Sequence, residues 1–100
     1  MKLKKAETLS RTFYENFQLL DIPDDASERI EYLLMYCTSL TDKERLLMQK
    51  RYIDGWSRNR IAEEFEETLE KVRGIEARAF KKMRHPMWKS IQILKDGWRE

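Results

Sequence analysis

Cysteine, histidine, glycine and proline are all scarce in this sequence of 100 residues. Cys37 is the only cysteine and His85 the only histidine, so neither a disulfide framework nor a cysteine- or histidine-based metal site can form within one chain. We expect Cys37 to fill the core and His85 to lie at a helix C-terminus. The lone cysteine suits a reducing cytosol, and we expect a cytoplasmic protein that holds no metal and no cofactor.

Long apolar runs and catalytic motifs are lacking as well. No apolar run approaches the ~18 residues of a membrane span, and the basic start MKLKKAETLS is not followed by the apolar segment of a secretory signal. The acidic residues are scattered as helix caps and helix-face partners, and no glycine-rich phosphate loop or Ser/His/Asp arrangement occurs. The length predicts one domain. We therefore predict a protein that is not an enzyme and has no membrane partner.

Charge is abundant, at 38% of the residues, and it is unevenly distributed. Residues 1–40 hold five Lys/Arg and seven Asp/Glu, whereas residues 66–100 hold nine and six. Such an asymmetry suggests an anionic partner for the C-terminal half, with nucleic acid or a membrane surface as the two options that charge alone leaves open.

No run of residues alternates between apolar and polar, so we predict an all-α fold, a small bundle of five to six helices containing a helix-turn-helix. Asp25 with Glu28, the Thr41–Glu44 capping box, Ser57 and Thr68 are the expected helix starts. The expected helices cover about 5–19, 26–39, 41–53, 58–65, 69–84 and 87–97.

Apolar residues recur along each expected helix at helical spacing and predict its buried side. The five aromatic rings of the first two helices either fill the core or leave a patch for a protein partner. The expected core positions are Leu9, Phe13, Phe17 and Leu20; Ile30, Leu33, Leu34, Cys37 and Leu40; Leu46, Leu47, Met48 and Tyr52; Val72, Ile75, Ala79 and Met83; and Met87, Ile91, Leu94 and Trp98.

A short helix, a brief break and a longer basic helix between Ser57 and Arg84 form a helix-turn-helix pattern. In that motif the second helix lies in the major groove, with its N-terminal residues at base edges. Its basic side chains either contact phosphates or form a solvated helix face, and the pattern alone leaves both open. These side chains are Lys71, Arg73, Arg78, Lys81, Lys82 and Arg84.

Three stretches carry a family resemblance: LTDKERLLMQKRY (40–52), IAEEF (61–65) and VRGIEARAFKKMRHP (72–86). In this order they resemble the C-terminal promoter-recognition domain, the fourth conserved region, of sigma factors of the bacterial sigma-70 family. The resemblance covers about residues 27–90. We accordingly assign 27–100 to a sigma region 4-like helix-turn-helix domain and leave 1–26, an N-terminal helix and linker, unassigned.

The resemblance implies a set of site residues and partners. Domains of this family dock on the β flap of the RNA polymerase core and read double-stranded promoter DNA upstream of the start site. By position, Lys43, Arg51, Ser57 and Arg58 would hold the DNA backbone, and Thr68, Leu69, Glu70, Lys71, Arg73 and Gly74 would form the DNA-facing end of the recognition helix. Arg78, Lys81 and Arg84 resemble a surface that activators, as partner proteins, use, so not all of them need face DNA.

Three departures from the family pattern bear on DNA reading. Leu69 stands where the housekeeping members have an arginine, and Gly74 where they have a glutamine, so two bidentate base contacts are lost. Gly74 reflects either drift or a close approach of the helix backbone to DNA. Glu67 replaces a small apolar residue and, with Glu66, places two acids beside the groove-facing end.

We therefore predict a sigma-like transcription regulator that engages RNA polymerase and an upstream promoter element through its helix-turn-helix. Lone domains of this size resemble phage late-gene regulators and one half of a split bacterial sigma factor, so a second sigma-like subunit, an activator or an anti-sigma protein are further candidate partners. The alternative is an interaction protein that docks on the polymerase or an anti-sigma protein and has lost base reading.

Overall fold

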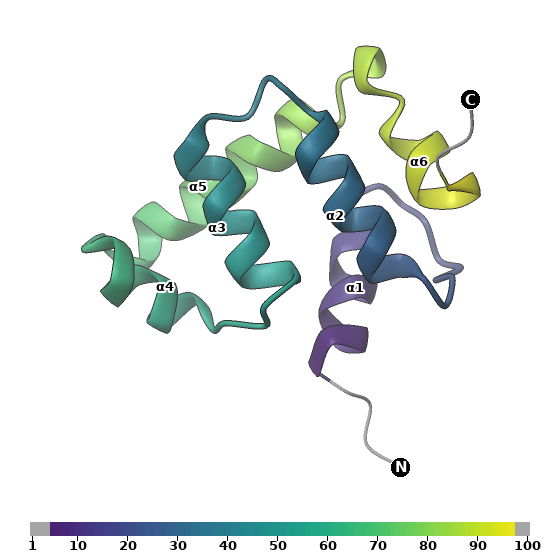
Figure 1. Cartoon of the computed structure of the whole chain (residues 1–100). Coiled ribbons are helices and arrows are strands. Elements are labelled where there is room, and N and C mark those ends of the chain that lie inside the picture. Colours follow the sequence, from purple (N-terminus) through teal and green to yellow (C-terminus); the bar gives the residue numbers. More distant parts are fainter. Residues whose placement is uncertain (1–4, 98–100) are drawn as a thin grey trace.

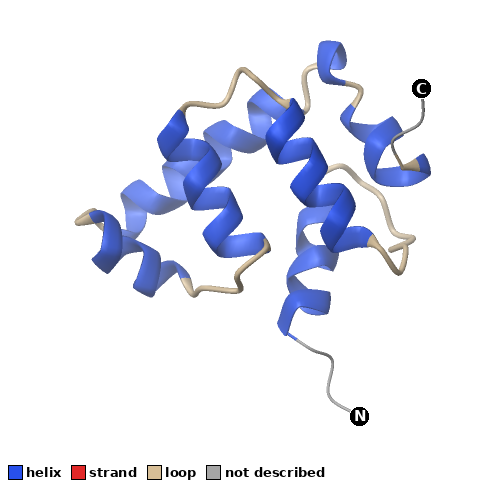
Figure 2. Ribbon diagram, viewed as in Figure 1, coloured by secondary structure: helices blue, strands red, loops and turns tan. Residues whose placement is uncertain are grey.

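Six α-helices and one short 3-10 helix form the fold in the computed structural model, which describes the backbone of residues 5–97 and the side chains of residues 9–97 (Figures 1 and 2). No strand occurs within that range, so the predicted all-α bundle is confirmed. The helices are α1 (Lys5–Glu15), α2 (Ala26–Tyr36), α3 (Asp42–Tyr52), α4 (Arg58–Phe65), α5 (Leu69–Met83) and α6 (Ser90–Asp96), and the 3-10 helix is Pro86–Trp88.

Three of the four expected N-caps are confirmed. Thr41 accepts a hydrogen bond from the backbone N–H of Glu44 and its own N–H donates to the Glu44 carboxylate, which completes the capping box. Ser57 and Thr68 cap α4 and α5 by accepting from the backbone N–H groups of Arg60 and Lys71. Asp25 does not: its side chain makes no capping bond and instead pairs with Arg29 Nε at 2.8 Å, so that prediction is wrong.

The first helix ends at Glu15 rather than near residue 19. Gln18 adopts a left-handed backbone with φ of 60°, and the N–H of Leu19 bonds back to the carbonyl of Tyr14. This turn directs the chain away before Leu20, whose side chain is 78% exposed and does not join the core. Helical periodicity therefore predicted the helix but not the left-handed turn that stops it.

The connection into the last helix also differs from the prediction. His85 directly follows the C-cap of α5, where its N–H bonds to the carbonyl of Lys82, and its Nδ1 accepts a hydrogen bond from the N–H of Met87 and starts the 3-10 helix. Lys89 then takes a left-handed backbone, φ 49°, so α6 begins only at Ser90. The register shifts as a result, Met87 and Ile91 are exposed, and Ile93 with Leu94 forms the buried side. Trp98 lies outside the described residues.

The expected stripes on the other helices lie in the core, with one exception. Leu46 is exposed because α3 buries the opposite side, which carries Leu47, Met48 and Tyr52. Cys37 is fully buried, as expected. None of the described helices is long and apolar enough to cross a bilayer.

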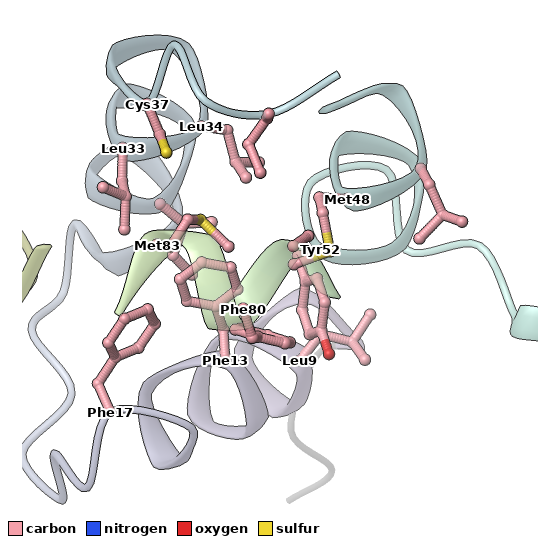
Figure 3. Packing of buried hydrophobic residues seen from close by; sticks show 14 of the residues in the cluster. Leu9, Phe13, Phe17, Leu33, Leu34, Cys37, Met48, Tyr52, Phe80 and Met83 are labelled. Atoms are coloured by element: carbon pink, nitrogen blue, oxygen red, sulfur yellow. The ribbon is translucent and has the colours of Figure 1, made fainter. Parts of the chain in front are cut away.

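Aromatic rings from α1, α3 and α5 meet in the hydrophobic core (Figure 3). The ring of Phe13 lies 5.1 Å from that of Tyr52 and 5.0 Å from that of Phe80, measured between centroids, and Phe17 joins the same cluster. Phe13, Tyr14 and Phe17 thus fill the core, whereas Tyr32 and Tyr36 are half-buried against it. The N-terminal helix therefore shares one core with the helix-turn-helix.

Polar contacts hold α6 against the first two helices. The Tyr14 hydroxyl donates a buried hydrogen bond of 2.6 Å to the carbonyl of Leu94, and Arg29 donates to the carbonyls of Leu94 and Lys95. These carbonyls belong to the last turn of α6, where no intrahelical donor is available. Figure 1 shows α6 beside α2, on the side of the molecule away from α4.

Candidate nucleic-acid interface

The chain from α4 to α5 forms a helix-turn-helix, as the pattern predicted. Glu66 ends α4 in a left-handed conformation, φ 54° and ψ 44°, and the N–H of Glu67 bonds to the carbonyl of Ala62. Thr68 then caps α5 by accepting from the N–H of Lys71 at 3.1 Å. The turn is short and is held by these bonds, and Figure 1 shows the shorter α4 set at an angle to the start of the longer α5.

Helix α5 is buried along one side and exposed along the other. The exposed side has a central row of Glu70, Gly74 and Ala77. A groove on one flank of this row is lined by residues that include Lys71 and Arg78.

The opposite flank carries a second groove, which is lined by residues that include Arg58, Arg73 and Ala77. The exposed side of α5 is therefore a low ridge with cations along both of its edges.

The expected DNA-facing residues of α5 all lie at its N-terminal end. Glu70, Lys71, Arg73 and Gly74 are exposed, and Leu69 is half-buried. An ideal Cβ added to Gly74 would meet no other atom within 4 Å. Packing within the chain therefore does not require glycine at this position.

Each of the four residues expected to hold the DNA backbone makes a polar contact with another residue of this chain. Lys43 pairs with Glu67, and Ser57 uses its hydroxyl oxygen to cap α4. Arg51, which is half-buried, donates to the carbonyl of Trp56 at 2.9 Å. Their DNA contacts remain predictions, because the structure contains no nucleic acid.

Arg58 belongs to a buried network that sequence reasoning missed. Its Nε and Nη2 donate to the two carboxylate oxygens of Glu76, at 2.8 and 3.2 Å. The Tyr52 hydroxyl also donates to this carboxylate, and Glu76 is only 6% exposed. Burial, and then the hydrogen bond to Glu76, raise the pKa of Tyr52. The only sequence signal was an acid on the apolar side of α5, one residue after Ile75.

A second network joins the C-terminal half of α5 to α3. Lys82 Nζ lies 2.7 Å from Oε1 of Glu44, the buried acid of the capping box. Burial alone would raise the pKa of Glu44, but the hydrogen bonds from Lys82 and from the N–H of Thr41 outweigh it and leave this pKa below its ordinary value. Lys82, one of the basic side chains considered for phosphate contact, is therefore paired with a carboxylate of the protein itself.

The three residues expected to bind a partner protein lie further along α5. Arg78, Lys81 and Arg84 are exposed, and Arg84 donates to the carbonyl of Asn16 at 3.3 Å. Arg78 and Lys81 border a groove that Met87 and Trp88 line from the other side. The structure thus brings cations and apolar side chains together at this end of α5.

A helix-turn-helix with an exposed, cation-flanked second helix is the architecture of DNA-binding transcription domains. The family model described as sigma-70, region 4 matches residues 38–85. This part of the chain is a sigma-70 region 4 domain, a DNA-binding helix-turn-helix domain of sigma factors, as the sequence motifs predicted. Comparisons with curated proteins and with solved structures gave no match. Helices α1, α2 and α6 lie outside the matched segment, which is narrower than residues 27–90.

Proposed function

We propose that this protein is a transcription regulator that lays α5 in the major groove of an upstream promoter element and engages RNA polymerase at the same time. The observation that carries this proposal is the shape of α5: a low row of Glu70, Gly74 and Ala77 between two cationic edges. A major groove has a floor of base edges and two phosphate walls. A ridge that Gly74 and Ala77 keep low, with Glu70 as the acid at its start and cations along its flanks, suits that geometry.

The residues of α5 then divide into base readers and phosphate contacts. Arg73 is the side chain at this end that can form the bidentate contact with guanine. Leu69 can touch only a thymine methyl, and Gly74 adds no side chain. We therefore expect a recognition sequence different from the one that housekeeping sigma factors read.

The internal contacts of Arg58 are compatible with a role at the DNA backbone. A guanidinium has five N–H donors in a fixed plane. The two donor atoms that bind Glu76 orient this plane and leave further donors for a phosphate. Glu76 would thus position Arg58 rather than remove it from the interface.

The polymerase contact rests on the family resemblance and on the C-terminal half of α5. The exposed Arg78, Lys81 and Arg84, with the groove beside Met87 and Trp88, form the surface that we assign to a protein partner. The β flap of the polymerase core is the partner that the family implies. An activator or an anti-sigma protein would use the same surface.

The test begins with selection of bound duplexes from a random pool, followed by titration of the selected DNA at several salt concentrations. The slope of log affinity against log salt should be near −0.9 for each neutralised phosphate. Arg73→Ala should weaken binding to the selected sequence by about 1–3 kcal/mol and relax its specificity, whereas Lys71→Ala, at an exposed cation on the edge of the ridge, should weaken every duplex by a similar factor. Equal, negligible effects of both changes would contradict this placement of α5.

The docking alternative makes a different prediction in the same experiments. It requires that the protein retain RNA polymerase core in a pull-down while no duplex binds even at low salt. Leu69, Gly74 and the two acids of the turn favour it. Retained DNA binding with a measurable salt slope would exclude it.

A further inference from the structure

An ion pair joins the start of α3 to the turn of the helix-turn-helix. Lys43 Nζ lies 2.8 Å from Oε2 of Glu67. Lys43 belongs to the first turn of α3, and Glu67 immediately precedes Thr68, the cap of α5. One partner is therefore a cation assigned to the DNA backbone, and the other lies next to the helix end that would enter the groove.

The charges around Glu67 show that it interacts with more than one cation. The Glu67 side chain is 22% exposed, and that of Lys43 is 50% exposed. The hydrogen bond from Lys43 lowers the pKa of Glu67, and the charge of Lys71 acts in the same direction. Glu67 is thus ionised and influenced by two lysines that both belong to the candidate DNA interface.

A DNA phosphate and the Glu67 carboxylate compete for the same ammonium group. Exposed ion pairs of this kind are weak and are screened by salt. The pair can therefore open when a phosphate arrives, but the DNA gains less from Lys43 than it would from a cation without a carboxylate partner. The family pattern has a small apolar residue at this position, which could not compete in this manner.

We propose that Glu67 limits the affinity of this helix-turn-helix for duplex DNA by occupying Lys43 in the free protein, an inference that rests on the proposed DNA-binding function. The domain then holds DNA weakly by itself. A second contact, to a protein already at the promoter, would raise the effective concentration of the domain and hold it in place. Glu67 would in this way make promoter binding depend on the partner.

The experiment compares Glu67→Gln with Glu66→Gln, which removes the same charge from the adjacent, exposed position. The probe is a short fluorescent duplex of random sequence, titrated at several salt concentrations. Glu67→Gln should raise the affinity about two- to five-fold at low salt, the range of one exposed ion pair, because Lys43 no longer has to leave a carboxylate to reach a phosphate. Glu66→Gln should give a smaller gain.

Both changes are then repeated in a Lys43→Ala background, with Glu67→Ala as a second variant and thermal unfolding as a check on the fold. Without Lys43, the gain from Glu67→Gln should fall to that from Glu66→Gln. If the wild-type protein binds the duplex and the two glutamine changes alter its affinity equally, the role of Glu67 is overturned and the DNA-binding proposal stands. If no variant binds the duplex at low salt, both proposals are overturned.

Discussion

A substitution at Gly74 has one expected effect on stability and another on DNA binding, and the two can be measured separately. Glycine inside a helix is less favourable than alanine by about 0.5–1 kcal/mol, and a Cβ at this position would meet no atom within 4 Å. Gly74→Ala should therefore raise the free energy of unfolding by about that amount, measured by urea titration. If α5 approaches DNA closely here, the same variant should bind duplex more weakly despite its greater stability.

The matched control is Gly97→Ala. Gly97 has φ of 77°, a backbone conformation that alanine adopts only with strain, so this change should lower stability even though the added Cβ would make ordinary contact with Arg29. Unchanged DNA affinity in Gly74→Ala would favour drift as the origin of the glycine. A loss of stability in that variant would contradict the open surroundings of Gly74.

Single residues also show where sequence reasoning succeeded and where it could not. The caps at Thr41, Ser57 and Thr68 were predictable because a capping bond joins residues three apart in the chain. The Lys43–Glu67 pair was not, because its members are 24 residues apart and meet only once α3 lies beside the turn.

Among the elements, α1 is the one whose role the sequence left open. Its Phe13 contacts Tyr52 of α3 and Phe80 of α5, so α1 completes the core on which the helix-turn-helix rests. Phe13→Ala should lower the free energy of unfolding by about 3–5 kcal/mol through lost burial and the cavity left behind. Far-UV circular dichroism during urea unfolding should show one transition that moves as a whole.

The control for this change is Leu20→Ala, because Leu20 is 78% exposed just beyond α1. Its effect should lie within about 0.5 kcal/mol of zero. A Phe13→Ala protein that loses only part of its helical signal, with the rest unfolding as in the wild type, would show that α1 is an appendage and not part of the cooperative unit.

At the level of the elements, the extent of the helices followed from periodicity and caps, to within a few residues at their ends. The buried side of the last helix did not, because Pro86 and the left-handed Lys89 insert a 3-10 turn that changes which side of α6 is buried. Backbone turns of this kind depend on what the following helix packs against. The hydrogen bonds that hold α6, from Tyr14 and Arg29, come from helices far away in the sequence.

For the whole molecule, buried polar networks fix the direction of α5. Glu76 ties its middle to α3 and α4, and Lys82 ties its C-terminal half to the capping box of α3. These bonds are directional and add to the orientation that the buried apolar side of the helix already imposes. The cationic edges of α5 thus keep a fixed orientation relative to the turn.

Two buried groups, the Tyr14 phenol and the Glu44 carboxylate, predict how the stability of the fold depends on pH. Burial raises the pKa of Tyr14 from 10.0 to about 12. A raised folded-state pKa means that the contribution of the neutral phenol is fully present below the unfolded value of 10.0 and is lost as pH rises toward 12. Glu44 has the opposite sign: its pKa is lowered in the fold, so its contribution is present above the ordinary value of 4.5 and is lost as pH falls.

Urea midpoints measured across the pH range should therefore show a plateau that declines on both sides. In Tyr14→Phe the alkaline decline should be shallower than in the wild type, because one of the buried phenols no longer titrates, although the plateau is lower by the lost hydrogen bond to Leu94. In Glu44→Gln the acid decline should be shallower instead. An alkaline limb unchanged by Tyr14→Phe would mean that this hydroxyl ionises in the folded protein as easily as in the unfolded chain, which is incompatible with its burial between α1 and α6.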